Sequence, residues 1–142
     1  RGSHFSYFRE ISKNKGLINV IFHKEISNEE IINLYKNCFA GIVILNKNHE
    51  THNIPGKFIS YIHSGLPVFA ILNKGNDLIN IINENKVGYA TSSYELSYLE
   101  KKMKYFIELT ENDFDIRERS KALANQQFKT KNICNQIIKK FK

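Results

Sequence analysis

Three short apolar runs, separated by segments with helical periodicity, constrain the fold of this 142-residue chain more than any other feature. Runs rich in valine and isoleucine are typical of strands, and GIVIL (residues 41–45) indicates a strand that is covered on both faces. The others are PVFAIL (67–72) and VGYAT (87–91), and a fourth run, NVIFH (19–23), precedes them. Strands that are joined by helices of about ten residues pair in parallel through right-handed crossovers. We therefore predict a three-layer α/β fold, a Rossmann-like parallel sheet flanked by helices, with a helical C-terminal tail.

The segments between the runs carry helix start and stop signals. A first helix is expected from about Phe5 to Gly16, because glycine is a typical residue at a helix C-terminus. Ser27 followed by Glu30 forms a capping box at the start of a second helix. The apolar face of that helix is expected at Ile31, Leu34 and Cys38. Further helices are expected from Pro55, over 76–85, and from Tyr94 to Phe141 with a turn at 111–113.

The extent of the domain follows from the same pattern. Residues 1–4 (RGSH) resemble the remnant of an expression tag and are left out of the fold. The pattern then begins with a helix and contains about four strands, whereas doubly wound domains usually have five or six. We therefore expect residues 5–142 to form a single Rossmann-like domain that lacks its first strand or strands.

Composition limits the classes of partner. The formal net charge is +7, which favours anionic partners, but arginine is scarce and the lysines are spread along the chain. A nucleic-acid partner is therefore not expected. No apolar stretch reaches the roughly 20 residues of a membrane-spanning helix, and no signal peptide is recognisable. Cys38 and Cys134 are interpreted as two buried or partly buried thiols, in preference to a disulfide.

The segment NIPGKFISYIHSGLPVFAIL (53–72) holds the strongest candidate for a binding site. Pro55 suits the first position of a helix, and Gly56 removes side-chain bulk beside the free N–H groups of the first turn. A helix start attracts phosphate through these groups and through the helix dipole, and Lys57 adds a full positive charge. Two interpretations stay open from local physics alone. Pro55 and Gly56 hold a phosphate there, or they only mark the start of an ordinary helix.

Helical spacing divides this segment into two faces. An apolar stripe that must pack on the sheet is formed by Phe58, Ile59 and Ile62. A second face recurs at steps of three and four residues and is expected to point toward the ligand cleft, at Lys57, Ser60, Tyr61 and Ser64.

The same segment resembles a known family. IPGKFISYIHSGLPVFA (54–70) is similar to the P-S-K-x-x-E-Y-x-x-x-G-x-P-V segment of retaining nucleotide-sugar glycosyltransferases with two Rossmann domains, the GT-B architecture. The flanking segments 19–45 and 75–90 are similar to the strands and helices of that family, in the same order. The resemblance covers about residues 17–128, although only the Pro55–Val68 motif is specific.

The resemblance implies which residues bind the donor. The backbone around Ile54, Gly56 and Lys57 would face the diphosphate, with Gly56 at a position where relatives often have serine. His23 and Lys24, which follow the first predicted strand, would border the nucleobase.

Two positions depart from the family pattern. Many relatives carry two glutamates eight positions apart, and the second typically binds the ribose hydroxyls. These positions correspond here to His52 and Ser60, and neither is a carboxylate. Glu50 is the nearest acid and would take the catalytic role after a shift of the loop. A serine binds a ribose more weakly than a carboxylate does, because charge-assisted hydrogen bonds are roughly twice as strong.

As a whole, the resemblance implies the donor-binding C-terminal domain of a bacterial glycosyltransferase, inactive without its N-terminal domain. The expected donor is UDP-N-acetylhexosamine, and the acceptor is a polyprenyl-linked or saccharide chain in polysaccharide, lipopolysaccharide or O-antigen synthesis. Neither a metal nor another cofactor is expected. The expected location is the cytoplasm, with peripheral contact at the inner face of the plasma membrane. The alternatives are a sugar-nucleotide epimerase of the same fold and a non-catalytic, flavodoxin-like interaction domain.

Two further clusters have ordinary explanations. His49, Glu50 and His52 lack the spacing of a metal site, and a polar loop is the better interpretation. The second cluster places lysines beside aromatic residues, and a solvated helix face is favoured over contact with a membrane surface: Lys101, Lys102 and Lys104 beside Tyr98, Tyr105 and Phe106.

Overall fold

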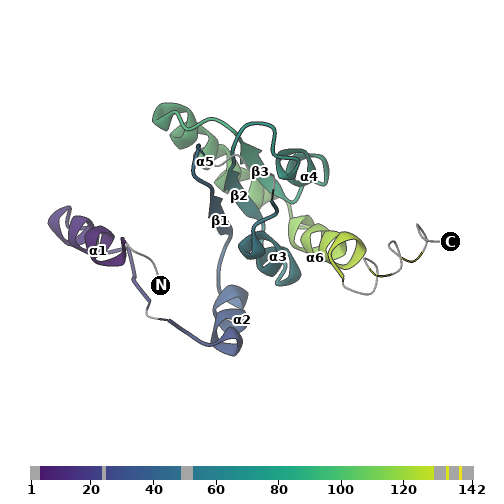
Figure 1. Cartoon of the computed structure of the whole chain (residues 1–142), viewed down its shortest axis with the longest axis horizontal. Helices are drawn as coiled ribbons and strands as arrows, with labels where there is room; N and C mark the ends of the chain where they lie inside the picture. Colours follow the sequence, from purple (N-terminus) through teal and green to yellow (C-terminus); the bar gives the residue numbers. More distant parts are fainter. Residues whose placement is uncertain (1–3, 24, 49–52, 130–133, 135–137, 139–142) are drawn as a thin grey trace. The chain divides into compact units, whose positions relative to one another are not determined.

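The computed structural model describes residues 4–23, 25–48, 53–129, 134 and 138 (Figure 1). The chain divides into two compact units, Arg1–Leu34 (unit 1) and Tyr35–Lys142 (unit 2). The expectation of a single domain over 5–142 stays a prediction. None of the helices in the described ranges is both long and apolar enough to cross a membrane.

Unit 1 contains helix α1 (Phe5–Asn14) and the start of helix α2 (Asn28–Lys36). Gly16 follows the end of α1 with a φ of 62°, which confirms it as the residue that ends the helix. The capping box before α2 is also confirmed, because the Ser27 N–H donates to the Glu30 carboxylate at 2.7 Å. The Glu30 N–H donates in return to Ser27 Oγ at 3.2 Å.

The predicted strand over 19–23 is wrong, because these residues form no regular secondary structure. A strand needs a neighbouring strand for its backbone hydrogen bonds, and the described part of unit 1 contains none.

Unit 2 contains one parallel sheet of three strands, β1 (Gly41–Ile44), β2 (Val68–Ile71) and β3 (Gly88–Thr91). The strand order is β1-β2-β3, so that β2 is central, and all four of its residues are buried. Each of the other two strands pairs with β2 over four residues, for example Gly41 with Val68 and Val68 with Gly88. The three runs 41–45, 67–72 and 87–91 are thus confirmed as strands.

Helices cover both faces of this sheet. On one face, α3 (Gly56–His63), α4 (Leu78–Glu84) and α6 (Ile116–Gln127) pack over the larger core, which includes Phe58, Ile62 and Leu123. On the other face, α5 (Leu96–Asn112) contributes Phe106 to a smaller core with Phe69. Figure 1 shows the three strands between α5 and the neighbouring pair α3 and α6. The three-layer, Rossmann-like α/β fold is confirmed.

The two edges of the sheet differ. At the β3 edge, the Asn83 side chain donates to the Ala90 carbonyl at 3.0 Å and accepts from the Ala90 N–H at 2.9 Å. The amide therefore satisfies backbone groups that a further strand would otherwise pair. Within β3, a Cβ added at Gly88 would lie 1.9 Å from the Val68 carbonyl oxygen. Only glycine allows this close approach.

At the β1 edge, the prediction of a strand covered on both faces is wrong. Val43 is buried in the larger core, but Ile42 and Ile44 are 49% and 64% exposed on the other face. The physical reason is that α5 packs over β2 and β3, and the smaller core that it forms includes no residue of β1.

Cys38 also differs from its prediction as part of the apolar face of the second helix, because α2 ends at Lys36. Both cysteines are free thiols, as predicted. Cys38 is partly buried, as expected, but Cys134 is exposed, so the prediction that it is buried or partly buried is wrong.

Two arginines of α6 donate hydrogen bonds to backbone carbonyl groups that lie just before β1 and β3. Arg117 donates to the Cys38 and Phe39 carbonyls at 2.9 and 3.1 Å, just before β1. Arg119 donates to the Lys86 carbonyl at 2.9 Å and forms an ion pair with Asp113. The guanidinium group holds the pKa of the Asp113 carboxyl below its ordinary value.

Candidate functional site

The candidate site lies at the edge of the sheet where the strands end. In parallel sheets, ligands bind beyond the carboxyl ends of the strands. The last turn of α3 lies at the opposite edge, because the Tyr61 ring contacts Gly41 at the beginning of β1. Since α3 runs back from the end of β1 to the beginning of β2, its first turn is directed toward the carboxyl edge.

The first turn of α3 is exposed. Pro55 is the cap residue (φ −62°, ψ 134°) and not the first helical residue as predicted. Proline has no side-chain acceptor, and no side chain among the described residues caps the N–H groups of Gly56 and Lys57. The next N–H group, that of Phe58, donates to the Pro55 carbonyl at 3.0 Å. A Cβ at Gly56 would meet no protein atom within 4 Å, which leaves room for a ligand.

In the two other helices that begin at this edge, backbone N–H groups of the first turn already donate to side chains. In α4, the Leu78 N–H donates to Asn76 Oδ1 at 3.0 Å. In α5, the N–H groups of Ser97 and Tyr98 donate to the Glu95 carboxylate at 2.9 and 2.7 Å. Glu95 also places a negative charge where an anion would approach. Of these three starts, only that of α3 favours an anion.

The buried stripe of α3 is confirmed. Phe58 and Ile62 are completely buried in the larger core, and Ile59 packs against it. The Phe58 ring meets the Phe128 ring edge to face at 5.8 Å. The core therefore holds one side of α3 in place and leaves Lys57 and Ser60 on an exposed side.

Two predicted donor-binding residues on α3 already make internal contacts. Ser60 Oγ donates to the Gly56 carbonyl at 3.1 Å, so the hydroxyl proton is used within the helix while the oxygen can still accept. Tyr61 is partly buried, and its ring meets the Tyr35 ring edge to face at 5.0 Å. Burial, followed by the neighbouring Tyr35 and Cys38, raises the pKa of the Tyr61 phenol. Tyr61 thus packs α3 against the beginning of β1.

The structure says less about the remaining predicted site residues. Ile54 is exposed and lies directly before the cap residue of α3. His23 is exposed in unit 1. Lys24, Glu50 and His52 lie outside the described residues, so their roles stay predictions.

Exposed lysines follow the carboxyl ends of two strands. Lys47 follows β1 and Lys74 follows β2, and both are exposed, as is Lys57. The hydroxyl group of Tyr94, after β3, donates to the Leu45 carbonyl at 2.9 Å and ties two of these loops together. An exposed, uncapped helix start beside lysines can hold an anion, and a phosphate suits the N–H groups best.

The lysine-rich face of α5 has local partners. The ammonium group of Lys102 lies 5.4 to 5.6 Å from the ring centres of Tyr89, Tyr98 and Tyr105. Lys104 pairs with Glu100 at 3.1 Å. These contacts suit the predicted solvated helix face.

Sequence reasoning did not single out the caps Asn76 and Glu95. Both are polar residues one or two positions before a helix, and this was the signal available in the sequence. In the described ranges, no three histidine, cysteine or acidic side chains gather in a way that could hold a metal ion. In comparisons with known proteins, no family model, no curated protein and no solved structure matches the chain.

Proposed function

We propose that unit 2 is the donor-binding domain of a glycosyltransferase that uses a nucleotide-activated sugar. The observation that carries this proposal is the exposed start of α3 at the carboxyl edge of the sheet, where Pro55 leaves N–H groups uncapped. Gly56 leaves the approach open, and Lys57 adds charge. The resemblance of residues 54–70 to the glycosyltransferase motif supports a nucleotide diphosphate as the anion.

In this proposal, the donor is a UDP-linked N-acetylhexosamine and its diphosphate lies on the first turn of α3. When the bond between the sugar and the phosphate breaks, negative charge grows on the departing diphosphate. The free N–H groups, the helix dipole and Lys57 stabilise that charge without a metal ion. Glu50 is the proposed catalytic carboxylate, and Ser60 accepts a hydrogen bond from the ribose.

The rest of the reaction is assigned outside unit 2. A polyprenyl-linked or saccharide acceptor would bind to an N-terminal domain, and transfer would take place at the cytoplasmic face of the membrane in polysaccharide synthesis. The 142-residue chain is accordingly proposed to bind donor nucleotide without transferring its sugar.

The test is the affinity of the chain for UDP and for uridine, measured by calorimetry for the parent and for Gly56→Val. The valine should block the N–H groups and abolish UDP binding. It should lower the free energy of unfolding by only about 1 kcal/mol, since the buried stripe begins at Phe58. His63→Val, at the exposed far end of the same helix, is the matched control and should bind UDP like the parent. UDP binding by Gly56→Val at the parent level would refute the proposal.

Lys57→Ala separates the role of the charge from that of the backbone. UDP affinity should fall by about tenfold while uridine affinity stays the same, because the ammonium group is directed at phosphate. The loss should shrink as salt concentration rises. An equal loss for UDP and uridine would contradict a diphosphate at this position.

A further inference from the structure

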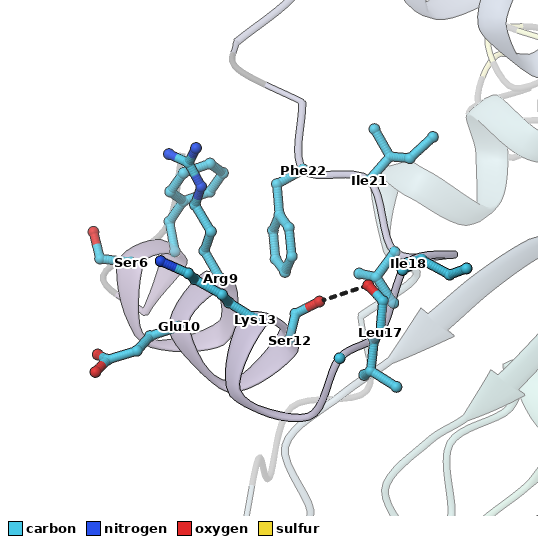
Figure 2. A pocket seen from close by; sticks show the side chains of 12 residues that line it. Ser6, Arg9, Glu10, Ser12, Lys13, Leu17, Ile18, Ile21 and Phe22 are labelled. Carbon is cyan, nitrogen blue, oxygen red and sulfur yellow. Dashed lines mark hydrogen bonds between the residues drawn. The ribbon is translucent and has the colours of Figure 1, made fainter.

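A groove with a volume of about 940 Å³ lies within unit 1, between α1 and residues 17–22 (Figure 2). Figure 2 shows the charged groups of Glu10 and Lys13 pointing away from residues 17–22. The side chains of Ile18 and Ile21 point away from α1. These side chains do not converge on a common ligand, so the groove indicates no ligand class. The carboxyl end of β2, in unit 2, does contain groups that lack partners.

Asn73 follows the central strand β2 at the carboxyl edge of the sheet and is only 4% exposed. Both of its oxygen atoms already accept hydrogen bonds. The Asn76 N–H donates to the Asn73 carbonyl at 3.2 Å, and Asn76 Nδ2 donates to Asn73 Oδ1 at 3.2 Å. The N–H groups of Asn73, in the backbone and in the side chain, have no acceptor among the described residues. Asn73 is therefore a buried residue whose acceptors are used and whose donors are free.

The orientation of the Asn73 amide follows from its neighbours. Asn76 Oδ1 accepts from the Leu78 N–H at 3.0 Å, so the other end of the Asn76 amide is its NH₂ group. That NH₂ group needs an acceptor, which is Asn73 Oδ1. A flipped Asn73 amide would bring two donors together. The NH₂ group of Asn73 is thus the end without a partner.

The backbone N–H of Asn73 lies one step beyond the last hydrogen bond between β1 and β2. The Leu45 N–H donates to the Ile71 carbonyl at 2.9 Å, and the parallel pattern would continue from the Asn73 N–H to the Leu45 carbonyl. That bond is absent from the described residues, and the Tyr94 hydroxyl donates to the Leu45 carbonyl at 2.9 Å. Strand pairing therefore leaves a second donor free at Asn73.

The free amide of Asn73 is accessible to a ligand. In the described ranges, Thr110 Oγ1 is the only fully enclosed side-chain polar atom that lacks a hydrogen-bond partner. The NH₂ group of Asn73 is therefore not sealed in the interior. Native structures rarely leave donors of buried residues unpaired, and ligands of parallel sheets bind at the edge where Asn73 lies. A ligand with an acceptor atom would complete these hydrogen bonds.

We propose that Asn73 is a specificity-determining residue that donates to the acetamido carbonyl oxygen of the donor sugar, an inference that rests on the proposed function. A carbonyl oxygen suits the position because it only accepts hydrogen bonds, and Asn73 has only donors to offer. The uracil carbonyls suit it less well, because an N–H group lies between them and would also need an acceptor. A sugar without the acetamido group would leave the donors of Asn73 unpaired, and sites of this kind discriminate against such ligands.

The test compares UDP-N-acetylglucosamine, UDP-glucose and UDP as ligands of the 142-residue chain, by calorimetry. The two sugar nucleotides differ only at the acetamido position. The parent should bind UDP-N-acetylglucosamine at least about tenfold more tightly than UDP-glucose. Equal affinities for the two would overturn this inference, while UDP binding would leave the proposed donor site standing. No binding of any of the three would refute the proposed function, and this inference with it.

Two variants remove the side-chain donors of Asn73 in different ways. Asn73→Asp keeps an oxygen for Asn76 and adds negative charge, whereas Asn73→Ala adds no charge and loses the contact with Asn76. In both variants, the preference for UDP-N-acetylglucosamine over UDP-glucose should fall to about twofold or less. UDP affinity in Asn73→Ala should stay within about twofold of the parent. Circular dichroism and thermal unfolding verify that each variant is folded.

Asn48→Asp is the matched control for charge, because Asn48 is exposed in the loop that follows β1. This variant should change the affinities for all three ligands by the same factor, so that the preference stays at the parent level. A preference that survives in both Asn73 variants would overturn the inference. A loss in Asn73→Ala that is equal for UDP and UDP-N-acetylglucosamine would also overturn it, because the contact would then lie on the UDP part of the ligand.

Discussion

The starts of α3 and α5 are alike in position, but only the start of α3 has backbone N–H groups that are available to a ligand. Each follows a strand and a polar loop at the carboxyl edge of the same sheet. At α5, the Glu95 carboxylate accepts two backbone N–H groups and the Ser97 hydroxyl, which donates at 2.6 Å. At α3, Pro55 provides no acceptor. Whether a helix start can bind an anion therefore depends on one residue, the cap, and not on the fold around it.

The largest effect is expected when the buried side of the first turn of α3 is removed. Phe58→Ala should lower the free energy of unfolding by about 3–5 kcal/mol, because it opens a cavity among completely buried residues. UDP affinity of the folded fraction should stay near that of the parent. Chemical denaturation and calorimetry measure the two quantities. A stable Phe58→Ala protein that had lost UDP binding would place the phenyl ring at the ligand and not in the core.

The second effect is expected when α3 receives a cap like that of α5. Pro55→Asp should accept the free N–H groups and raise the free energy of unfolding by about 1 kcal/mol. It should also weaken UDP binding about tenfold through charge repulsion. Pro55→Ser, which caps without charge, serves as the comparison and should fall between the parent and the aspartate variant. Unchanged UDP affinity in Pro55→Asp would show that the cap does not control the site.

A third change restores the carboxylate that the glycosyltransferase motif has at position 60. Ser60→Glu should tighten UDP binding about fivefold, or about 1 kcal/mol, because a charged acceptor binds a ribose hydroxyl more strongly than a neutral one. Ser60→Gln, which is similar in size and neutral, should give little of this gain. Calorimetry with UDP and with 2′,3′-dideoxy-UDP separates ribose contacts from the rest. Weaker UDP binding by a folded Ser60→Glu protein would contradict this placement of the ribose.

The smallest effect concerns pH and α5. The Ser97 hydroxyl, followed by the N–H groups of Tyr98 and Ser97, lowers the pKa of the Glu95 carboxyl. A carboxyl whose pKa is lower in the folded protein stabilises it above the unfolded pKa, and this stabilisation is lost as pH falls through the folded value. Glu95→Gln should therefore lower the Tm at neutral pH, and the difference from the parent should disappear in acid. UDP affinity at neutral pH should not change. A Tm difference that grew in acid would contradict this account.

Short-range features were predictable, because neighbouring residues alone determine them. The capping box at Ser27 and Glu30, the end of α1 before Gly16 and the buried stripe of α3 all formed as expected. The three apolar runs of unit 2 became strands as predicted, although this required pairing with β2 as well as residues that favour strands. The exposed start of α3 also followed from Pro55 and Gly56.

Other features depended on partners that are distant in the sequence. NVIFH and GIVIL look equally like strands, but only GIVIL pairs with a neighbour in the described residues. The exposure of Ile42 and Ile44 depends on where α5 packs, which their own sequence does not encode. Tyr61 has the spacing of a ligand-facing residue, but the lack of a side chain at Gly41 lets its ring pack there instead. Hydrogen bonds between strands and contacts between side chains form only after the chain has closed long loops. Local sequence therefore specified which helices and strands can form, and the long-range contacts decided which of their surfaces became core, edge or open site.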